Sequence, residues 1–347
     1  MEFFKNKTIL ITGHKGFLGS WLSLLLYKKC KSIYGISHKE NKNNIFNLLN
    51  LNSKIQSYCF DLNNTKKLTN FFRNKKIDIV IHLAAQAIVY EAFKNQENTI
   101  KNNFLITLNL LSKTNHFRNM IFVNFTSDKV YENSNNKKKR FDENATLFGS
   151  DPYSFSKSCG DMLSKVWSEN NKNSNKYINI RSGNIIGGGD WGKNRIVPDI
   201  MISIFKKKKL KIRQPNSTRP WISVFEVCKY IIELLKKSHK IKNKFSAWNI
   251  GPSKNENIKV ISLIKLFKIK TEEKNLKAQK YKTKIKEKKF LNLNNNKINN
   301  FLKKKYLLSV NDRIEFTYEW YKTYYLNKKK IKEKTSDQIK QYLKKIN

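Results

Sequence analysis

The chain of 347 residues is long enough for one large domain or two moderate ones, and it has no apolar run of about 18 residues that could span a membrane. Its formal net charge of +44 comes mostly from lysines spread over nearly every polar segment, alongside abundant Asn and Ile, whose codons are similarly AT-rich. Because no nucleic-acid-binding motif accompanies these lysines, composition favours a solvated basic surface over a specific nucleic-acid partner.

Near-continuous apolar runs alternate with longer helical segments through the first half of the chain. The runs predict strands at residues 8–13, 32–37, 55–62, 77–85, 120–127 and 177–185. Long helices are predicted at about 99–114 and 153–169. Strands separated by helices predict an α/β fold built on a doubly wound parallel Rossmann sheet. Ligands would then bind at the edge where the carboxyl ends of the strands meet.

The alternation of apolar runs and helical segments becomes irregular after this sheet, which suggests a second, smaller region. We expect a Rossmann domain over residues 1–185 and a mixed substrate domain over 186–325, with a strand near 247–251 that could return to the sheet. Residues 326–347 are charged and weakly patterned, which predicts a basic C-terminal tail, either a surface helix or a frayed end.

The spacing of the cysteines bears only on their redox state and on metal binding. Cys30, Cys59, Cys159 and Cys228 lie far apart with no metal-ligand spacing, so we expect reduced thiols and no metal site. A strand and a glycine turn begin within the first residues, so we also expect no signal peptide and a cytoplasmic location.

Glycines at the first strand–helix junction predict a dinucleotide site. Gly13, Gly16 and Gly19 form GxxGxxG where the first strand passes into a helix, and such a turn lets backbone N–H groups approach a pyrophosphate. Further cofactor contacts are expected from the same turn and from later segments: Phe17, Leu18, Ser37, Asp61, Leu62, Ala84, Ala85, Gln86 and Asn103.

The end of the second strand leaves the choice between NAD and NADP open. An acidic residue there would bind the ribose hydroxyl of NAD. The chain instead has Ser37, His38 and Lys39, and Lys39 would tolerate a 2′-phosphate.

Two groups of residues can carry chemistry. Tyr153 and Lys157 are four residues apart, hence on one helix face, where an ammonium beside the phenol would lower the tyrosine pKa toward neutrality. Ser127, Asp128 and Lys129 end a buried strand with a hydroxyl, a carboxyl and an amine on consecutive residues. Burying these polar groups beside a core costs free energy, so their presence together indicates a functional role.

These segments resemble the extended short-chain dehydrogenase/reductases, the NAD-dependent epimerase/dehydratase family. The resemblance runs over about residues 5–325 and is carried by TGHKGFLG, LAAQ, TSDKVY, DPYSFSK, RSGNIIGGGDW, RIVPDI and STRPW. Within the family it is to nucleotide-sugar 4,6-dehydratases, most narrowly to those acting on CDP-glucose. Three positions depart from the family pattern: Tyr90 stands in place of an arginine, Ala92 in place of a serine and Ile106 in place of a glycine.

The resemblance implies a lyase that converts CDP-glucose to CDP-4-keto-6-deoxyglucose, with NAD as a recycled cofactor. Tyr153 and Lys157 would oxidise carbon 4, Ser127 would bind its oxygen, Asp128 would protonate the departing hydroxyl and Lys129 would remove the C5 proton. Whether burial or nearby charge controls the pKa of Lys129 stays open. Substrate contacts are expected from Asn184, Arg195, Arg219 and Trp221, although packing is an equal alternative for each of them except Arg219.

The resemblance also implies a homodimer, or a tetramer, formed through the helices at about 99–114 and 153–169, and a place in deoxysugar synthesis for a surface polysaccharide such as O-antigen. Two other functions stay open: a dehydratase or epimerase acting on a dTDP-, GDP- or UDP-linked sugar, and a polyanion-binding protein on an inactive dehydrogenase scaffold.

Overall fold

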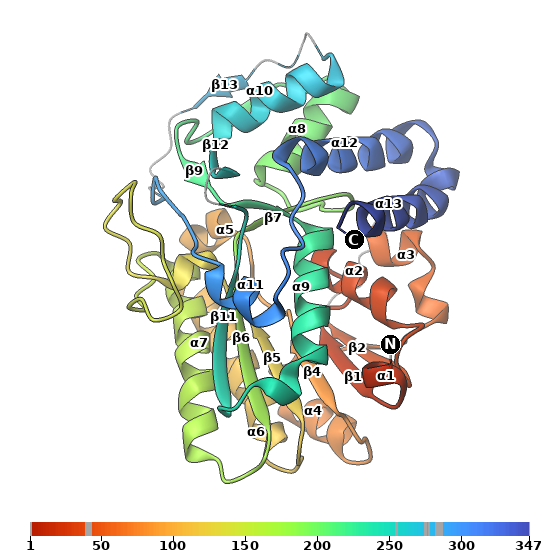
Figure 1. Cartoon of the computed structure of the whole chain (residues 1–347), viewed down its shortest axis with the longest axis vertical. Coiled ribbons are helices and arrows are strands. Elements are labelled where there is room, and N and C mark those ends of the chain that lie inside the picture. Colours follow the sequence, from red (N-terminus) through yellow and green to blue (C-terminus); the bar gives the residue numbers. More distant parts are fainter. Residues whose placement is uncertain are drawn as a thin grey trace.

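The computed structural model describes residues 2–38, 44–253, 256–273, 276, 278–281 and 287–346. In this part of the chain the centre is a seven-stranded sheet of order β11-β6-β5-β4-β1-β2-β3, with every neighbouring pair parallel (Figure 1). The strands are β1 (Thr8–Thr12), β2 (Ser32–Ser37), β3 (Gln56–Cys59), β4 (Ile79–His82), β5 (Ile121–Phe125), β6 (Lys176–Ser182) and β11 (Phe245–Ile250). The predicted doubly wound parallel sheet is confirmed.

Helices cover both faces of this sheet, which explains why its strands are apolar at nearly every position. Ile9 and Ile11 of β1 point into one core with α2 (Phe17–Leu26) and α9 (Val224–Lys236). Leu10 between them points into the other, with α4 (Thr65–Phe72) and α6 (Gln96–Thr114). Successive side chains of a strand face opposite ways, so a sheet buried on both sides needs apolar residues without alternation.

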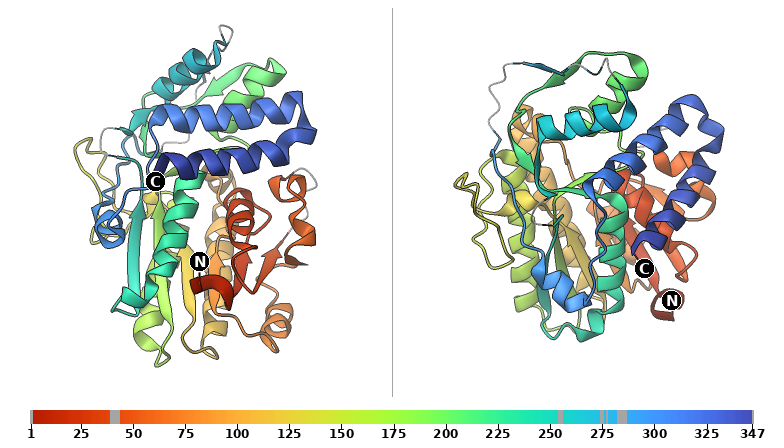
Figure 2. Two further views of the ribbon diagram at one scale, coloured as in Figure 1. Left: turned by 45° about the vertical axis from the view of Figure 1, so that its right-hand side comes forward. Right: turned by 45° about the horizontal axis from the view of Figure 1, so that its top comes forward.

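A second layer lies over the carboxyl edge of the sheet (Figures 1 and 2). Its described strands pair as β7 (Asn184–Ile186) with β10 (Trp221–Ser223), β9 (Thr218–Arg219) with β12 (Ile258–Lys259), and β8 (Leu210–Ile212) with β13 (Ala278–Lys280). Its helices are α8 (Ile196–Lys206), α10 (Val260–Thr271) and α12 (Val310–Leu326). The remaining elements are α1 (Glu2–Lys5), α3 (Ile45–Leu48), α5 (Val89–Lys94), α7 (Pro152–Asn170), α11 (Asn296–Leu302), α13 (Ile331–Ile346), and the 3-10 turns η1 (Leu51–Ser53), η2 (Asp128–Val130), η3 (Ser238–Lys240) and η5 (Lys328–Lys330).

The chain crosses back into the first layer after entering the second. The strand expected near 247–251 is β11, which pairs with β6 from Phe245↔Tyr177 to Ile250↔Ser182 at the edge of the main sheet. Helix α9 packs on the same sheet. The two layers are therefore interleaved in sequence, and a single boundary near residue 185 describes only the first crossing.

Of the two forms expected for the C-terminal segment, a surface helix or a frayed end, the structure shows a helix. Residues 331–346 form α13, which buries Ile331 and Tyr342 in the main core. Trp320 of α12 donates its indole N–H to Thr335 at 2.9 Å. The lysines that obscured the pattern lie on the solvent face, because an amphipathic helix needs only one apolar stripe.

Among the described residues, no helix is long and apolar enough to cross a membrane, and no group of His, Cys, Asp and Glu side chains is arranged to hold a metal ion.

Candidate active site

A cavity of about 850 Å³ lies at the carboxyl edge of the sheet, beneath the second layer. All five predicted chemical residues line it, together with Gly13, Gly16, Phe17, Leu18, Gly19, Ala84, Ala85, Asn184, Arg195, Arg219 and Trp221. The predicted cofactor residues Ser37, Asp61, Leu62, Gln86 and Asn103 do not line it. The structure thus brings the two chemical groups to the glycine turn, which precedes both by more than a hundred residues in the sequence.

The glycine turn is a backbone cradle that fits a dinucleotide. Gly13 has a φ of +72°, in the left-handed region that favours glycine. A Cβ on Gly19 would lie 2.3 Å from the carbonyl oxygen of Gly13, so the turn and α2 approach as closely as they do only without a side chain. Helix α2 begins at Phe17, and its free N–H groups face the cavity region where the pyrophosphate of NAD would be held.

His14, inside this turn, is a scaffold residue that sequence reasoning missed. Its Nδ1 lies 2.9 Å from the hydroxyl of Ser37 and its Nε2 lies 2.5 Å from that of Ser57. Burial lowers the pKa of His14 to about 4, so the ring is neutral. Ser37, expected to contact the cofactor, is tied to this ring at the end of β2, while Lys39 lies outside the described residues.

The other predicted cofactor residues outside the cavity have structural partners. Asp61 lies 3.6 Å from His38, and Leu62 is buried in the core beneath α4 and α6. The Asn103 side chain accepts the backbone N–H of Gln86 at 2.8 Å and donates to Ser156 at 2.9 Å. Asn103 therefore fastens the loop after β4 to α7, and it acts on the site through the position of that helix.

Ser127, Asp128 and Lys129 sit where β5 ends in the 3-10 turn η2. The Ser127 hydroxyl caps this turn by accepting the N–H of Lys129 at 3.2 Å. The carboxyl of Asp128 is buried, and burial raises its pKa. Its Oδ1 accepts the Ser127 hydroxyl at 3.1 Å, whereas Oδ2 has no hydrogen-bond partner in the described part of the chain. A raised pKa and an unpartnered oxygen in a cavity suit this carboxyl to donating a proton to a bound ligand.

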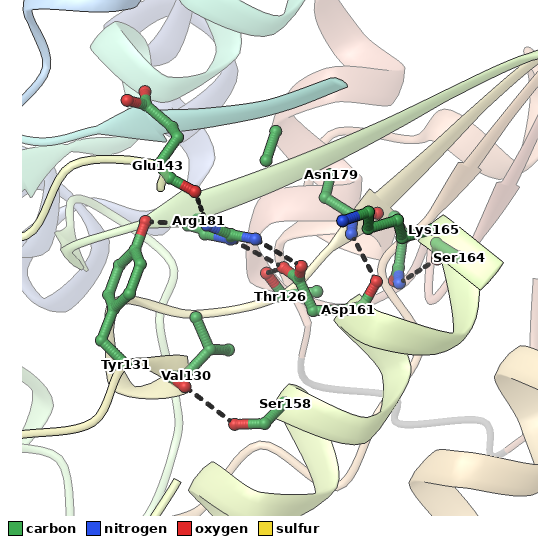
Figure 3. Close-up of polar contacts among 12 residues, drawn as sticks. Thr126, Val130, Tyr131, Glu143, Ser158, Asp161, Ser164, Lys165, Asn179 and Arg181 are labelled. Carbon is green, nitrogen blue, oxygen red and sulfur yellow. Dashed lines mark hydrogen bonds and ion pairs between the residues drawn. The ribbon is translucent and has the colours of Figure 1, made fainter. Parts of the chain in front are cut away.

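A buried ion pair supports this turn from below (Figure 3). Arg181 of β6 donates to both oxygens of Asp161 of α7, at 2.9 and 2.6 Å. Asp161 also accepts the hydroxyl of Thr126, at 2.9 Å, and Arg181 donates to the Tyr131 hydroxyl at 3.1 Å. Because Thr126 and Tyr131 flank the turn, the pair joins it to both β6 and α7.

Tyr153 and Lys157 lie in the first two turns of α7. Pro152 is the first residue of the helix, and the side chain of Asp151 caps it by accepting the N–H of Ser154 at 3.0 Å. The helix face predicted to carry both Tyr153 and Lys157 is therefore present, and both side chains line the cavity. Lys157 donates to the carbonyl oxygen of Phe125 at 2.9 Å, and burial lowers its pKa to about 8.

The tyrosine pKa differs from the sequence expectation. Burial raises the pKa of Tyr153, and a hydrogen bond with Ser127 and the charges of Lys129 and Arg195 only oppose that rise. The ammonium of Lys157 is directed to a backbone carbonyl, and it is not among the groups that shift the phenol. A phenolate in this cavity therefore needs additional positive charge.

Glu287 is an acidic residue of the site that sequence reasoning missed. Its Oε2 lies 2.9 Å from the amine of Lys129 and 3.5 Å from Arg219, and its Oε1 lies 3.9 Å from Arg213. Burial lowers the pKa of Lys129, but the charges of Glu287, Asp151 and Asp128 together outweigh it, so the net shift is upward. Glu287 comes 158 residues after Lys129 in a lysine-rich stretch without a motif, so only the fold reveals it.

The loop between β7 and α8 is held by aromatic packing. Trp191 lies edge-on to Tyr321 and against Tyr324 of α12, with ring centroids 5.2 and 4.6 Å apart. Arg195, a predicted phosphate ligand, pairs with Asp190 at 3.1 Å. Trp221 is buried and donates its indole N–H to the carbonyl of Ile258 at 3.2 Å, which identifies packing as one of its roles.

Comparison with known proteins agrees with this arrangement. A 2.9 Å crystal structure of a Bacillus anthracis dTDP-glucose 4,6-dehydratase in complex with NAD has the same fold: TM-score 0.78, 20% identity, covering 91% of this chain and 97% of that one. A Bacillus cereus UDP-glucuronic acid 4-epimerase in complex with NAD and UDP-glucuronic acid matches with TM-score 0.78, 23% identity and 91% and 99% coverage.

The sequence comparison points to a more specific group of proteins than the fold comparison does. The chain is 34% identical over 273 residues to a CDP-glucose 4,6-dehydratase from Salmonella typhimurium, spanning 76% of each chain. The sequence model of the NAD dependent epimerase/dehydratase family matches residues 9–251, from β1 through β11 and thus the whole parallel sheet with its glycine turn and α7. Site geometry, fold and sequence agree, and the chain belongs to the NAD-dependent epimerase/dehydratase family.

Proposed function

We propose that the protein is a hydro-lyase that converts CDP-glucose to CDP-4-keto-6-deoxyglucose. The observation that carries this proposal is the convergence of Ser127, Asp128 and Lys129 with Tyr153 and Lys157 in the cavity that the glycine turn also lines. The Salmonella typhimurium relative supports CDP-glucose as the substrate.

The oxidation at carbon 4 belongs to Tyr153. When bound, NAD⁺ supplies the redox chemistry, taking a hydride from C4 and returning it to C6. Tyr153 takes the proton of the C4 hydroxyl, and Ser127 hydrogen-bonds the same oxygen. Lys157, buried and still cationic below its pKa of about 8, supplies positive charge on the same helix face. The charges of Lys129 and Arg195 favour the phenolate as Tyr153 loses its proton.

The loss of water belongs to Asp128 and Lys129. A ketone at C4 acidifies the proton at C5, and Lys129 in its amine form removes that proton. Asp128, whose pKa is raised by burial, protonates the C6 hydroxyl so that it leaves as water. Lys129 must first lose its own proton, which its ion pair with Glu287 opposes.

A substrate panel tests the proposal. Purified protein with a trace of NAD⁺ is incubated with CDP-glucose, dTDP-glucose, UDP-glucose and GDP-mannose, and the 4-keto product is followed by its absorbance in alkali. We expect product from CDP-glucose without net NADH, and none with Tyr153→Phe. Stoichiometric NADH would indicate a simple dehydrogenase, and preference for another nucleotide would overturn the CDP assignment.

We also propose a homodimer formed through α6 and α7. Phe155, Met162 and Val166 are 40, 42 and 54% exposed and repeat at helical spacing along one face of α7. An apolar stripe of this kind is typical of a helix that packs against another copy. A cytoplasmic location suits an enzyme that uses nucleotide sugars, and its product would enter deoxysugar synthesis. Sedimentation of the wild type and of Val166→Lys tests the dimer.

A further inference from the structure

The proposed dehydration leaves two side chains out of their starting protonation states. In each cycle Tyr153 gains the proton of the C4 hydroxyl, and Asp128 loses a proton to the hydroxyl that leaves as water. Lys129 takes the proton from C5 and returns one to C5 when the hydride reaches C6, so its own count is unchanged. Before the next cycle, one proton must therefore leave Tyr153 and one must reach Asp128.

The hydroxyl of Ser127 connects these two groups. It donates to Oδ1 of Asp128 at 3.1 Å, accepts the backbone N–H of Lys129 at 3.2 Å and is hydrogen-bonded to the phenol of Tyr153. A serine hydroxyl has one hydrogen to donate and two lone pairs with which to accept. Because its hydrogen is directed to Asp128 and one lone pair holds the turn, the second lone pair is left for the phenol, which donates. The chain of hydrogen bonds therefore runs from Tyr153 through Ser127 to Asp128.

This chain is more direct than an exchange of both protons with solvent. Ser127, Asp128 and Tyr153 are only 7, 3 and 9% exposed. The nearby ammonium of Lys157 donates to the carbonyl of Phe125 at 2.9 Å and is not among the groups that shift the phenol. Two separate exchanges with solvent would pass through a cavity with either no anion or two. Transfer through Ser127 keeps one anion throughout, and the charge of Lys129 favours the anionic form of either group.

We propose that Ser127 is a proton relay that returns the proton of Tyr153 to Asp128 between turnovers. The O–H bond of Ser127 breaks as its proton passes to Oδ1 of Asp128, and a new O–H bond forms on Ser127 with the proton of the phenol. No electrons are transferred, and the serine hydroxyl is regenerated. This role comes after product release and adds to the hydrogen bond with the C4 oxygen. It rests on the proposed dehydration but not on which nucleotide the sugar carries.

A comparison of the first turnover with later ones tests the relay. Enzyme equilibrated with NAD⁺ is mixed with excess CDP-glucose and quenched, and the 4-keto product is measured by its absorbance in alkali. A site that cannot reset completes one cycle and then waits, whereas a lost hydrogen bond to C4 slows every cycle alike. Ser127→Ala removes the relay and Ser127→Thr keeps a hydroxyl. Ser182→Ala is the matched control, because Ser182 also lines the cavity but donates to the carbonyl of Gly183 at 3.3 Å.

We expect Ser127→Ala to form about one product per site and then to turn over about 10²-fold more slowly, relative to its first cycle, than wild type does. Imidazole, a small proton carrier, should raise this slow rate and leave the first cycle unchanged. Ser127→Thr and Ser182→Ala should keep the wild-type ratio of later to first-cycle rates. Equal slowing of first and later cycles in Ser127→Ala would restrict Ser127 to the C4 oxygen and overturn the relay.

Wild type provides a second test that does not depend on how Ser127→Ala folds. Because its reset is internal, its steady-state rate should not change over a series of imidazole concentrations. A wild-type rate that rises with imidazole would show that protons reach the site from solvent and would overturn the relay. A wild type that forms no 4-keto sugar from any of the four nucleotide sugars would instead overturn the proposed function. If another of these sugars is the one converted, the same comparison is made with it.

Discussion

Two buried lysines in one cavity have opposite shifts in pKa. Lys157 donates to the carbonyl of Phe125, and burial lowers its pKa to about 8. Lys129 is buried too, but the charges of Glu287, 2.9 Å away, and of Asp151 and Asp128 together outweigh burial, and its pKa is raised. Burial alone disfavours a charged amine, whereas nearby anions favour it. In the free protein the amine of Lys157 therefore loses its proton at a lower pH than the amine of Lys129.

The largest effect is expected from removing the phenol of Tyr153, which lies on the same helix as Lys157. Tyr153→Phe should abolish C4 oxidation and with it every later step, because no ketone forms to acidify C5. General base catalysis contributes about 10²–10⁴-fold, so turnover should fall by at least that factor. Single-turnover absorbance should show no enzyme-bound NADH. Accumulation of bound NADH in this variant would assign the first proton to another group.

Substitution of Lys129 or Asp128 should separate the oxidation at C4 from the loss of water. Lys129→Met and Asp128→Asn should each slow water loss about 10²–10⁴-fold but leave C4 oxidation partly intact. Bound NADH should then accumulate in a single turnover with CDP-glucose, and Lys129→Met should not exchange the C5 proton with deuterium. Lys165→Met, on the exposed face of α7, is the control. Normal dehydration by Lys129→Met would mean that its amine has a structural role only.

The buried ion pair between Asp161 and Arg181 can be tested through the free energy of unfolding. Asp161→Asn leaves Arg181, which is 3% exposed, without its anion and should lower the free energy of unfolding by about 3–5 kcal/mol. Asp337→Asn removes a similar pair from the surface and should change it by less than about 1 kcal/mol. Denaturant unfolding measures both. Equal effects would show that the buried pair does not hold the turn in place.

The pKa difference itself should be visible in the free protein. Competitive acetylation with peptide mass spectrometry reports the neutral amine of each lysine as pH rises. Because the pKa of Lys157 is lowered, its reactivity should reach half its maximum near pH 8. Lys129, with a raised pKa, should stay protonated until above 10.5. Coincident midpoints would contradict the comparison, and Glu287→Gln should move only the Lys129 midpoint downward.

Short-range sequence patterns predicted the fold and much of the site. Apolar runs without alternation predicted a sheet buried on both faces, and β1 divides its side chains between two cores as that pattern requires. The glycine turn and the four-residue spacing of Tyr153 and Lys157 are local features, so their geometry follows from a few neighbouring residues. Asp151 and Pro152 likewise marked where α7 begins.

What only the tertiary structure decided involves groups that meet across long separations. Glu287 reaches Lys129 over 158 residues, and no motif in its lysine-rich segment predicts the contact. The direction of each pKa shift depends on burial and on partners from other elements, so the sequence left Lys129 undecided and gave Tyr153 the wrong sign. The packing of α13 was equally hidden, because its apolar stripe has meaning only against α12. Local patterns determine local geometry, whereas electrostatics and docking depend on what the fold brings within a few ångströms.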